Sequence, residues 1–454
     1  MFQTMRNAWK IAELRNKLLF TLLIIILYRI GANIPVPFID AGQIGSLSQA
    51  YKGTIFEFVN TLSGNAFSQA TVFALGVSPY ITSSIVIQLL SVAIPYFENL
   101  AKNGEEGKKV LSRWTRGVTA GLGLITAIGY TIYLESSGML AMPLMTNGKL
   151  TGAGFFRAVI LVACYCAGAC LVMWLAERIN EFGIGNGISI ILFANIIASF
   201  PNLALNIWQF FMPVDAATGT SSFNGWGIPL AIFTVVFMLA MIVLIIWITD
   251  SERKISIQYA KRTVGRKQYG GQSSTLPIKL NMTGVMPIIF ANAIVSIPAT
   301  IIAFFGKNPP KWLSTMNEIL GMNSWLYPLV FAILIIAFAY FYVMISFNPI
   351  EVANNIQQQG GQVRGIRPGR PTVEYIKKVL NRITLLGAFF ICAIAVLPIV
   401  IYLIFGLFSG TFQALFGSFA FLGSSIIIVV GVALETVREL EAQMSIRNYK
   451  GFLG

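Results

Sequence analysis

The sequence predicts an all-α polytopic membrane protein with ten transmembrane helices. Its 454 residues are 56% hydrophobic and only 11% charged, whereas about a quarter of the residues in a soluble domain are charged. Ten apolar runs are each long enough, at about 20 residues, to cross the hydrocarbon core of a bilayer. Of the 32 lysines and arginines, 26 lie on the side of the N-terminus and six on the other. Because cytoplasmic loops carry the excess of basic residues, both termini are expected in the cytoplasm.

The ten predicted spans follow one another along the whole chain. The segments after Met139 and after Phe210 contain Gly, Pro, Thr and Asn, which favour loops. The basic loops also account for the net charge of +14, so the charge is no reason to expect specific DNA binding. The centres of the spans lie near Ile26, Ile87, Ile125, Val162, Ile191, Val236, Ile294, Ile335, Ala393 and Ile428.

The stretch from Leu62 to Pro95 is interrupted and points to a pathway through the membrane. Its first part, to Leu75, is only mildly apolar, and Gly76, Ser78 and Pro79 then break the helical pattern before a denser apolar run. A broken helix at membrane depth is tolerated where it is buried in protein or lines a watery cavity. A kinked helix that only packs against its neighbours explains the pattern about equally well.

The residue types exclude most chemistry. Histidine is absent, the four cysteines fall inside apolar runs, and no nucleotide-binding, HExxH or GxSxG motif occurs. The centres of the spans carry no ionisable group of the kind that ion-coupled transporters need. Arg29 and Arg157 lie near outer ends and are interpreted as interfacial anchors or as partners of a loop acid, which we favour over a role in gating. We therefore expect neither an enzyme nor a cofactor or metal site.

Two long cytoplasmic loops, 250–280 and 348–379, are unusually basic. The first carries seven basic residues, and the second carries six when Arg382 at the next helix entrance is included. Both are explained equally well as solvated positive-inside loops or as a docking platform. Docking is favoured by the turn residues Gly365, Pro368 and Gly369 around Arg367 and, in the first loop, by two tyrosines beside a Gly-Gly pair.

Four stretches resemble the bacterial SecY family. They are LGVSPYITSSIVIQLL (75–90), ERINEFGIGNGISIILF (177–193), LPIKLNMTGVMPIIFA (276–291) and GIRPG (365–369), in the family's order. The resemblance covers nearly the whole chain. It implies the central subunit of the Sec translocon, which passes unfolded secretory polypeptides across the cytoplasmic membrane and releases hydrophobic segments laterally into the bilayer.

The resemblance also implies how the chain is divided. Residues 1–201 would form an N-terminal half with spans one to five, and residues 228–436 a C-terminal half with spans six to ten. These inverted, pseudo-symmetric halves would enclose an hourglass pore, with an external hinge at 202–227 and a cytoplasmic tail at 437–454.

Site residues follow from the same resemblance. The pore ring would consist of Ile81, Ile85, Ile188, Leu192, Ile289 and Ile428. The plug that rests beneath the ring would be Ser63, Gly64, Asn65, Ala66, Phe67, Ser68, Gln69, Ala70, Thr71 and Val72. The spacing of four within the pairs Ile81–Ile85 and Ile188–Leu192 independently places each pair on one helix face. Plain core packing is the alternative for any one ring residue.

A lateral gate would open between the second and third spans on one side and the seventh and eighth on the other. Gln88 and Asn292 are the polar residues expected near that seam, or they are satisfied within their own halves. The motor ATPase SecA and the ribosome would dock on the long loops at Arg262, Arg266, Lys267 and Arg367. SecE and SecG would be membrane partners, and signal sequences and unfolded precursors the ligands.

Two readings from other classes remain open. A secondary transporter shares interrupted helices and inverted repeats but would require a substrate or ion site at the midplane. A receptor or assembly scaffold would require no pore. Deleting residues 63–72 would raise conductance only in a channel.

Overall fold

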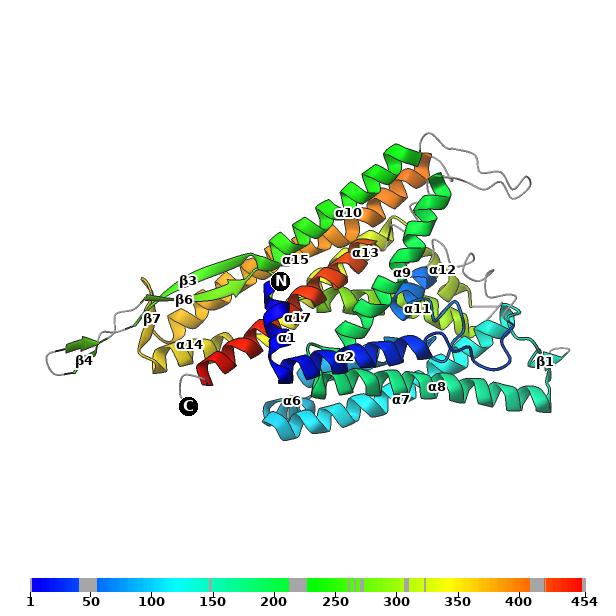
Figure 1. Ribbon diagram of the computed structural model, residues 1–454, viewed down its shortest axis with the longest axis horizontal. Helices are drawn as coiled ribbons and strands as arrows, with labels where there is room; N and C mark the ends of the chain where they lie inside the picture. The colour runs from blue at the N-terminus through cyan, green and yellow to red at the C-terminus, as the bar shows by residue number, and fades with distance from the viewer. Residues whose placement is uncertain are drawn as a thin grey trace.

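The computed structural model describes residues 2–40, 55–146, 149–211, 227–259, 262–264, 267–269, 273–305, 310–321, 324–408, 420 and 422–450. These residues form an elongated helical molecule (Figure 1). The long helices are α2 (Ala12–Gly31), α5 (Ser78–Ala93), α7 (Gly104–Ser136), α8 (Gly152–Phe182), α9 (Gly187–Phe211), α10 (Gly227–Asp250), α11 (Met286–Phe305), α13 (Leu326–Ser346), α15 (Arg370–Phe408) and α17 (Leu422–Lys450). The short ones are α1 (Phe2–Lys10), α4 (Ile55–Ser63), α6 (Pro95–Lys102), α12 (Lys311–Ile319) and α14 (Pro349–Gln358).

Each of the ten predicted span centres lies inside one of the long helices. Among the residues described, five helices are individually long and apolar enough to cross a membrane, and α5 with α6 makes a sixth if the bent pair is one span. The apolar parts of α9 and α11 are shorter. The helix order is consistent with ten spans, and the prediction of a polytopic helical membrane protein is confirmed.

The bend between α5 and α6 has a local cause. The two helices meet at an angle of 100°, and Ile94 between them is extended, with φ −116° and ψ 123°. Ile94 precedes Pro95, and the proline ring disfavours a helical conformation of the residue before it. The apolar helix α5 therefore ends there, and α6, which has no buried residue, turns away from it.

The two long loops contain a small sheet within the otherwise helical fold. Strands β3 (Glu252–Tyr259) and β6 (Ser273–Lys279) pair antiparallel, and β7 (Gly361–Val363) from the other long loop adds to β3. Two short hairpins, β1–β2 (Met145–Thr146, Lys149–Leu150) and β4–β5 (Arg262–Val264, Lys267–Tyr269), complete the strands described. The pairing of β3 with β7 makes one structure of the two loops.

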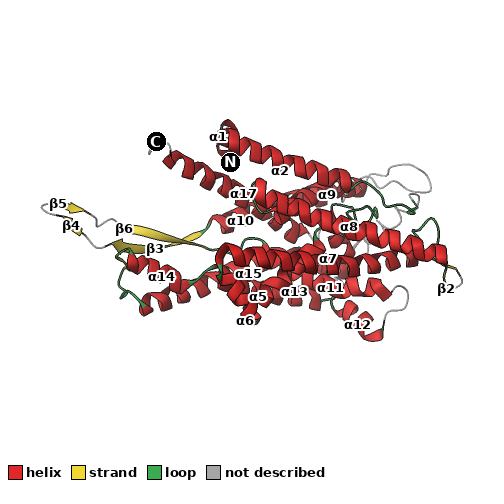
Figure 2. Cartoon of the chain, turned by 90° about the horizontal axis from the view of Figure 1, so that it is seen from below, coloured by secondary structure: helices red, strands yellow, loops and turns green. Residues whose placement is uncertain are grey.

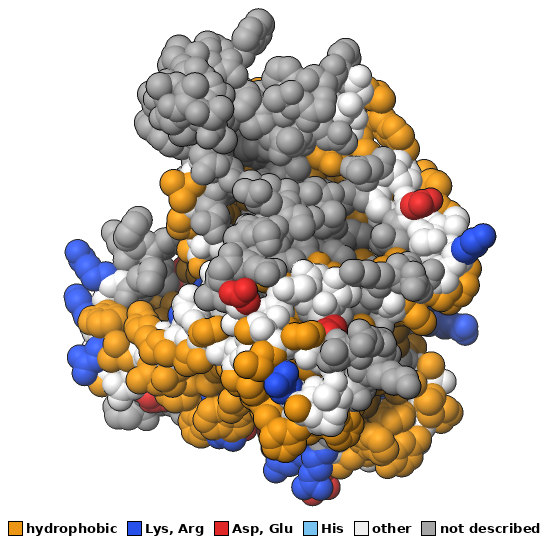
Figure 3. Space-filling view, turned by 90° about the vertical axis from the view of Figure 1, so that its right-hand side faces the viewer, with side chains coloured by type: hydrophobic (Ala, Val, Ile, Leu, Met, Phe, Trp, Pro, Cys, Tyr) orange, Lys and Arg blue, Asp and Glu red, His pale blue; other side chains and the backbone are white. Residues whose placement is uncertain are grey.

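The two ends of the molecule differ in content. Figures 1 and 2 show the sheet, the β4–β5 hairpin and both chain termini toward one end, with β1–β2 and α12 toward the other. A view onto the second end shows hydrophobic side chains over much of the lower surface and few charged ones (Figure 3). The helices between the ends expose large apolar side chains such as Phe156 and Trp247, each 68% accessible, as lipid-facing helices do.

The predicted halves pack against each other along two seams. On one side α9 packs against α17 and α10, and on the other α11 packs against α5 and α7. One core of buried apolar residues continues across both halves. Of the predicted hinge, residues 202–211 continue α9 and 212–226 lie outside the described residues. The predicted tail continues α17 as far as Lys450.

Candidate functional site

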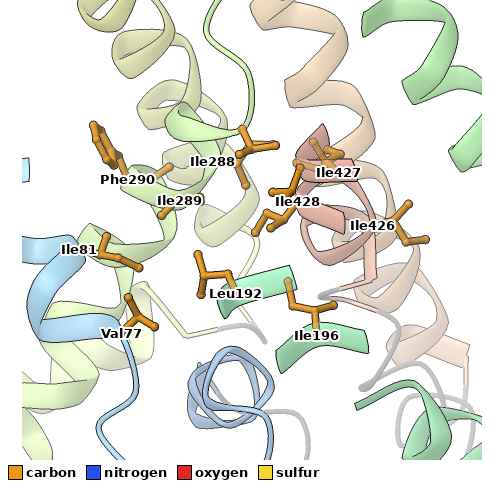
Figure 4. Close-up of a cluster of buried hydrophobic side chains, with 14 of the residues drawn as sticks. Val77, Ile81, Leu192, Ile196, Ile288, Ile289, Phe290, Ile426, Ile427 and Ile428 are labelled. Carbon is orange, nitrogen blue, oxygen red and sulfur yellow. The ribbon is translucent and has the colours of Figure 1, made fainter. Parts of the chain in front are cut away.

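Four of the six predicted ring residues gather in one place. Ile81 on α5, Leu192 on α9, Ile289 on α11 and Ile428 on α17 are all buried in the shared core, with at most 5% of their surface exposed. Their side chains converge from four helices in Figure 4. The two predicted halves each contribute two of these helices. The result is an aliphatic cluster with no polar group among its four members, which we call the collar.

The remaining two ring residues lie one helical turn away. Ile85 follows Ile81 by one turn on α5 and is buried in the same core, and Ile188 precedes Leu192 by one turn and is half-buried. Figure 4 instead shows Val77 and Ile196 beside Ile81 and Leu192, one turn in the opposite direction along each helix. Both are fully or almost fully buried. The spacing of four could have found them, but spacing gives no direction along a helix.

The predicted plug segment is a chain of turns that follows a helix. Helix α4 ends at Ser63, and residues 64–77 form turns up to the start of α5, so the first piece of the predicted broken helix is not helical. Side chains hold the turns together: Asn60 Oδ1 accepts from Ser68 N at 2.9 Å, and Ser63 Oγ accepts from Phe67 N at 3.1 Å. Most of the segment is buried. It is thus a compact unit inside the protein.

The end of this segment is attached to the chain that leaves α2. Val72 N donates to Ile34 O at 3.0 Å, and Val36 N donates to Ala70 O at 3.3 Å, which forms a short antiparallel bridge. Helix α8 lies directly against it, because a Cβ added at Gly168 would lie 2.0 Å from Val72 O. We call residues 70–72 the anchor.

Replacement of Gly168 tests the anchor. A methyl group there must push backbone apart, so we expect Gly168→Ala to lower the free energy of unfolding by about 1–3 kcal/mol. Gly121→Ala on α7 is the control, since nothing lies within 4 Å of the added Cβ. Thermal unfolding of both purified variants in detergent measures the difference. Equal midpoints would show that α8 does not constrain the anchor.

Arg29 departs from the two interpretations favoured from the sequence, an interfacial anchor and a partner of a loop acid. Its guanidinium donates to two main-chain carbonyls, Gly64 O at 3.4 Å and Ala194 O. It is therefore turned into the protein rather than out to the interface, and its recorded partners are neutral. An arginine near the end of a span satisfies the anchoring pattern in sequence whichever way it points, so only the structure distinguishes the two cases.

The two predicted gate amides are incompletely hydrogen-bonded. Gln88 Nε2 donates to Ser84 Oγ at 3.2 Å within α5, but the buried Oε1 has no partner among the described residues. The buried Nδ2 of Asn292 on α11 also lacks a partner there. Because α11 packs against both α5 and α7, the seam between these helices is closed in this structure. On the two sides of this seam, α5 and α11 each carry an unsatisfied polar atom among the described residues.

Arg367 stands on a defined turn beside the sheet. Gly365 and Gly369 have φ of +80° and +92°, which L-residues rarely adopt, and Thr372 Oγ1 donates to Arg367 O at 2.9 Å. The side chain of Arg367 is exposed. The predicted turn is confirmed. Of the other docking residues, Arg262 and Lys267 lie on the paired strands β4 and β5, and Arg266 lies outside the described residues.

The sheet is joined to the helices at its base. Arg438 Nη2 on α17 donates to Asp250 Oδ1 at 2.6 Å and to Thr249 O at 2.9 Å, at the end of α10. Burial lowers the pKa of Lys279 at the end of β6, and the positive charge of Arg438 acts in the same direction. Apolar residues of the sheet and α15, including Ile255 and Leu380, form a small core beneath it. The sheet is therefore a fixed extension of the helices.

Comparison with known proteins gives one consistent result. Residues 71–437 match the sequence model of the SecY family. The protein translocase subunit SecY of Streptomyces galbus is 40% identical over 457 residues, and that of Bacillus subtilis is 39% identical over 459, with both chains covered completely in each case.

Solved structures show the same fold. A protein-conducting channel aligns with a TM-score of 0.59 at 16% identity, over 95% of this chain and 92% of that one. Sec61 from a canine ribosome-channel complex aligns with a TM-score of 0.56 at 15% identity, over the same shares. With a family model that spans most of the sequence and full-length relatives near 40% identity, the chain belongs to the SecY family.

Proposed function

We propose that this chain is a protein-conducting channel, which translocates unfolded secretory polypeptides and releases hydrophobic segments sideways into the bilayer. The observation that carries the proposal is the collar of Ile81, Leu192, Ile289 and Ile428, drawn from four helices of both halves. A narrow apolar constriction loses its water and blocks ions. Aliphatic side chains also close around a passing chain without hydrogen-bonding to it. The chain carries out no chemical reaction and is not an enzyme.

The collar would be completed by Val77 and Ile196, with Ile85 and Ile188 lining the pore one turn away. Residues 63–72 would close the pore as its plug. The compact turns and the mostly buried position of this segment support that role. A relative of the same fold is described as having a plug domain that stabilises the closed state of the translocation channel.

Crosslinking tests the channel directly. A secretory precursor is stalled midway, with a photoreactive residue in its mature part, in membranes that contain the full complex. We expect crosslinks to α5, α9, α11 and α17, because these helices carry the collar. Crosslinks confined to lipid-facing residues such as Phe156 and Trp247 would instead support a receptor or scaffold without a pore.

Partners would assemble around this core. The exposed Arg367 and the β4–β5 hairpin would receive the motor SecA or the ribosome, and a related channel is described in a ribosome-channel complex. SecE would brace the two halves, and SecG would complete the complex. The placement of both termini and of the sheet from the two basic loops at one end supports an orientation with that end in the cytoplasm of a bacterial cell.

The gate amides give a prediction about signal sequences. Leucine removes a buried polar atom without a partner, so Gln88→Leu and Asn292→Leu should favour the closed seam by about 1 kcal/mol each. A signal sequence must then be more hydrophobic to open it. The measurement is export of one precursor with a graded series of signals, with Ser296→Ala on α11 as control. If the hydrophobicity that a signal sequence needs for export is unchanged, neither amide contributes to the gate and both are ordinary packing residues.

A further inference from the structure

Three side chains on helices around the plug donate hydrogen bonds to residues 62–67. Arg29 on α2 donates to Gly64 O at 3.4 Å, Asn195 Nδ2 on α9 donates to Leu62 O at 2.7 Å, and Tyr130 Oη on α7 donates to Phe67 O at 2.5 Å. Every acceptor is a main-chain carbonyl. The three helices all belong to the N-terminal half. The plug is therefore bound to one half through its backbone.

The backbone is available for this because the segment is not a regular helix. The last four carbonyls of any helix lack partners within it, and Leu62 lies at the end of α4. Beyond Ser63 the turns leave acceptor capacity on the main chain: Phe67 O accepts from Ala70 N at 3.3 Å, and a carbonyl oxygen can accept a second hydrogen bond. Buried carbonyls require partners, and the wall donors supply them. Binding of this kind depends little on which side chains the plug carries.

The donors are themselves held in place. Arg29 also donates to Ala194 O, and Asn195 Nδ2 also donates to Tyr28 Oη at 2.9 Å, so α2 and α9 are tied together at this point. The fit is close: a Cβ at Gly64 would lie 2.5 Å from Arg29 Nη1 and 2.9 Å from Asn195 Oδ1. Only glycine brings the plug backbone this near.

The bonds inside the plug fix its shape but not its place. Gly64 and Asn65 have φ of +66° and +70°, which these two residue types tolerate, and Ala70 in the anchor has φ of +48°, which an alanine seldom adopts. The internal bonds of Asn60 and Ser63 hold residues 60–68 together, but they do not attach this unit to the wall. External hydrogen bonds are needed to keep it in place.

We propose that Arg29, Tyr130 and Asn195 form a latch that holds residues 60–69 in the closed channel through main-chain carbonyls. Residues 70–72 stay attached to residues 34–36 and serve as the pivot. The inference rests on the proposed channel function. Of the plug residues 63–72, only 63–69 would then move when the channel opens, because Ala70, Thr71 and Val72 belong to the anchor. The resting state of the channel is then set by wall residues outside both plug and collar.

A pair of tyrosines tests the latch. Tyr130 and Tyr165 are both buried. Their rings pack edge to face, with the ring centroids 5.0 Å apart. Tyr165 Oη donates to Ala70 O at 3.3 Å, but Val36 N also donates to that carbonyl. Tyr130→Phe removes the bond between α7 and Phe67 O and leaves that carbonyl only Ala70 N, a donor inside the plug. Tyr165→Phe removes a bond at the anchor, where Val36 N, a donor from outside the plug, remains.

The complete complex is reconstituted in proteoliposomes, and transport is measured for a normal precursor and for one with a weakened signal sequence. Loss of one hydrogen bond shifts the closed–open balance by about fivefold. We expect Tyr130→Phe and Arg29→Gln to raise transport of the weak-signal precursor and resting ion conductance by about that factor, with Tyr165→Phe near the unaltered protein. Normal-precursor transport by each variant shows that it is folded.

Three results would overturn the proposal, and they are distinguishable. If the unaltered protein transports the normal precursor while Tyr130→Phe keeps its signal dependence and resting conductance, the latch is wrong and the channel stands. If Tyr165→Phe opens the channel as much as Tyr130→Phe, the anchor moves with the plug and the division made here fails. No transport by the unaltered protein contradicts the channel function and the latch with it.

Discussion

Arg367→Glu is expected to abolish motor-driven translocation. Gly365 and Gly369, with their positive φ, fix the turn that presents the exposed guanidinium of Arg367. The main-chain carbonyl of Arg367 accepts a hydrogen bond from Thr372 Oγ1. Charge reversal places a carboxylate where an acidic partner group would bind. Arg367→Lys should already impair coupling, because lysine retains the charge but loses the planar, bidentate fork. The measurement is transport of a secretory precursor into proteoliposomes, with ATP hydrolysis by the motor followed in parallel.

A neighbouring arginine supplies the control. Arg370 is the first residue of α15 and is highly exposed. Its Nε lies 3.9 Å from Glu374 Oε1. Exposed pairs of this kind contribute little, so Arg370→Glu should reduce transport far less at the same net charge. Neither variant should alter insertion or the conductance of a channel lacking its plug. If Arg367→Glu retains full transport, the basic residues of this loop serve only to set the membrane topology. The docking site must then be sought in residues 250–280.

Polar substitution of the collar is expected to make the closed channel leak. Asparagine at two collar positions on different helices, Ile81→Asn with Ile428→Asn, introduces donors and acceptors that retain water where the native side chains exclude it. Resting ion conductance in planar bilayers should rise by about tenfold or more, on the premise that dewetting is the barrier. Translocation of precursors should persist, because the constriction remains wide enough for a chain when open.

The control places the same polarity elsewhere. Val243→Asn with Leu171→Asn alters two exposed apolar residues on α10 and α8, away from the collar, and should leave resting conductance unchanged. Ile81→Leu with Ile428→Leu retains the apolar lining and should leave the seal intact. An unaltered seal in the Asn double variant would reduce the collar to ordinary core packing.

The membrane class, the order of the helices and the basic end of the molecule follow from composition and from the positions of apolar runs and basic residues in the sequence. Long apolar runs must form helices in a bilayer, because the backbone finds no other hydrogen-bond partner there, and each of the ten predicted centres lies in a helix. The turn around Arg367 was predictable for a local reason, since glycines and a proline set it. The SecY resemblance was likewise contained in continuous stretches of sequence.

The direction of side chains and the pairing of distant segments required the tertiary structure. Spacing placed Ile81 and Leu192 on helix faces but did not show that Val77 and Ile196 extend the collar beside them. The basic loops gave no sign that β7 would pair with β3, because strand pairing depends on register between segments about 100 residues apart.

Arg29 shows the difference most clearly. By itself the sequence determined that an arginine stands near the end of the first span, where burial, lipid contact and ion pairing are all compatible with its neighbours. Only the fold brings Gly64 O and Ala194 O to its guanidinium. The reason is physical: hydrophobicity is a property of each residue and is written locally, whereas a hydrogen bond requires two groups within about 3 Å, and that distance is decided by packing between helices remote in sequence.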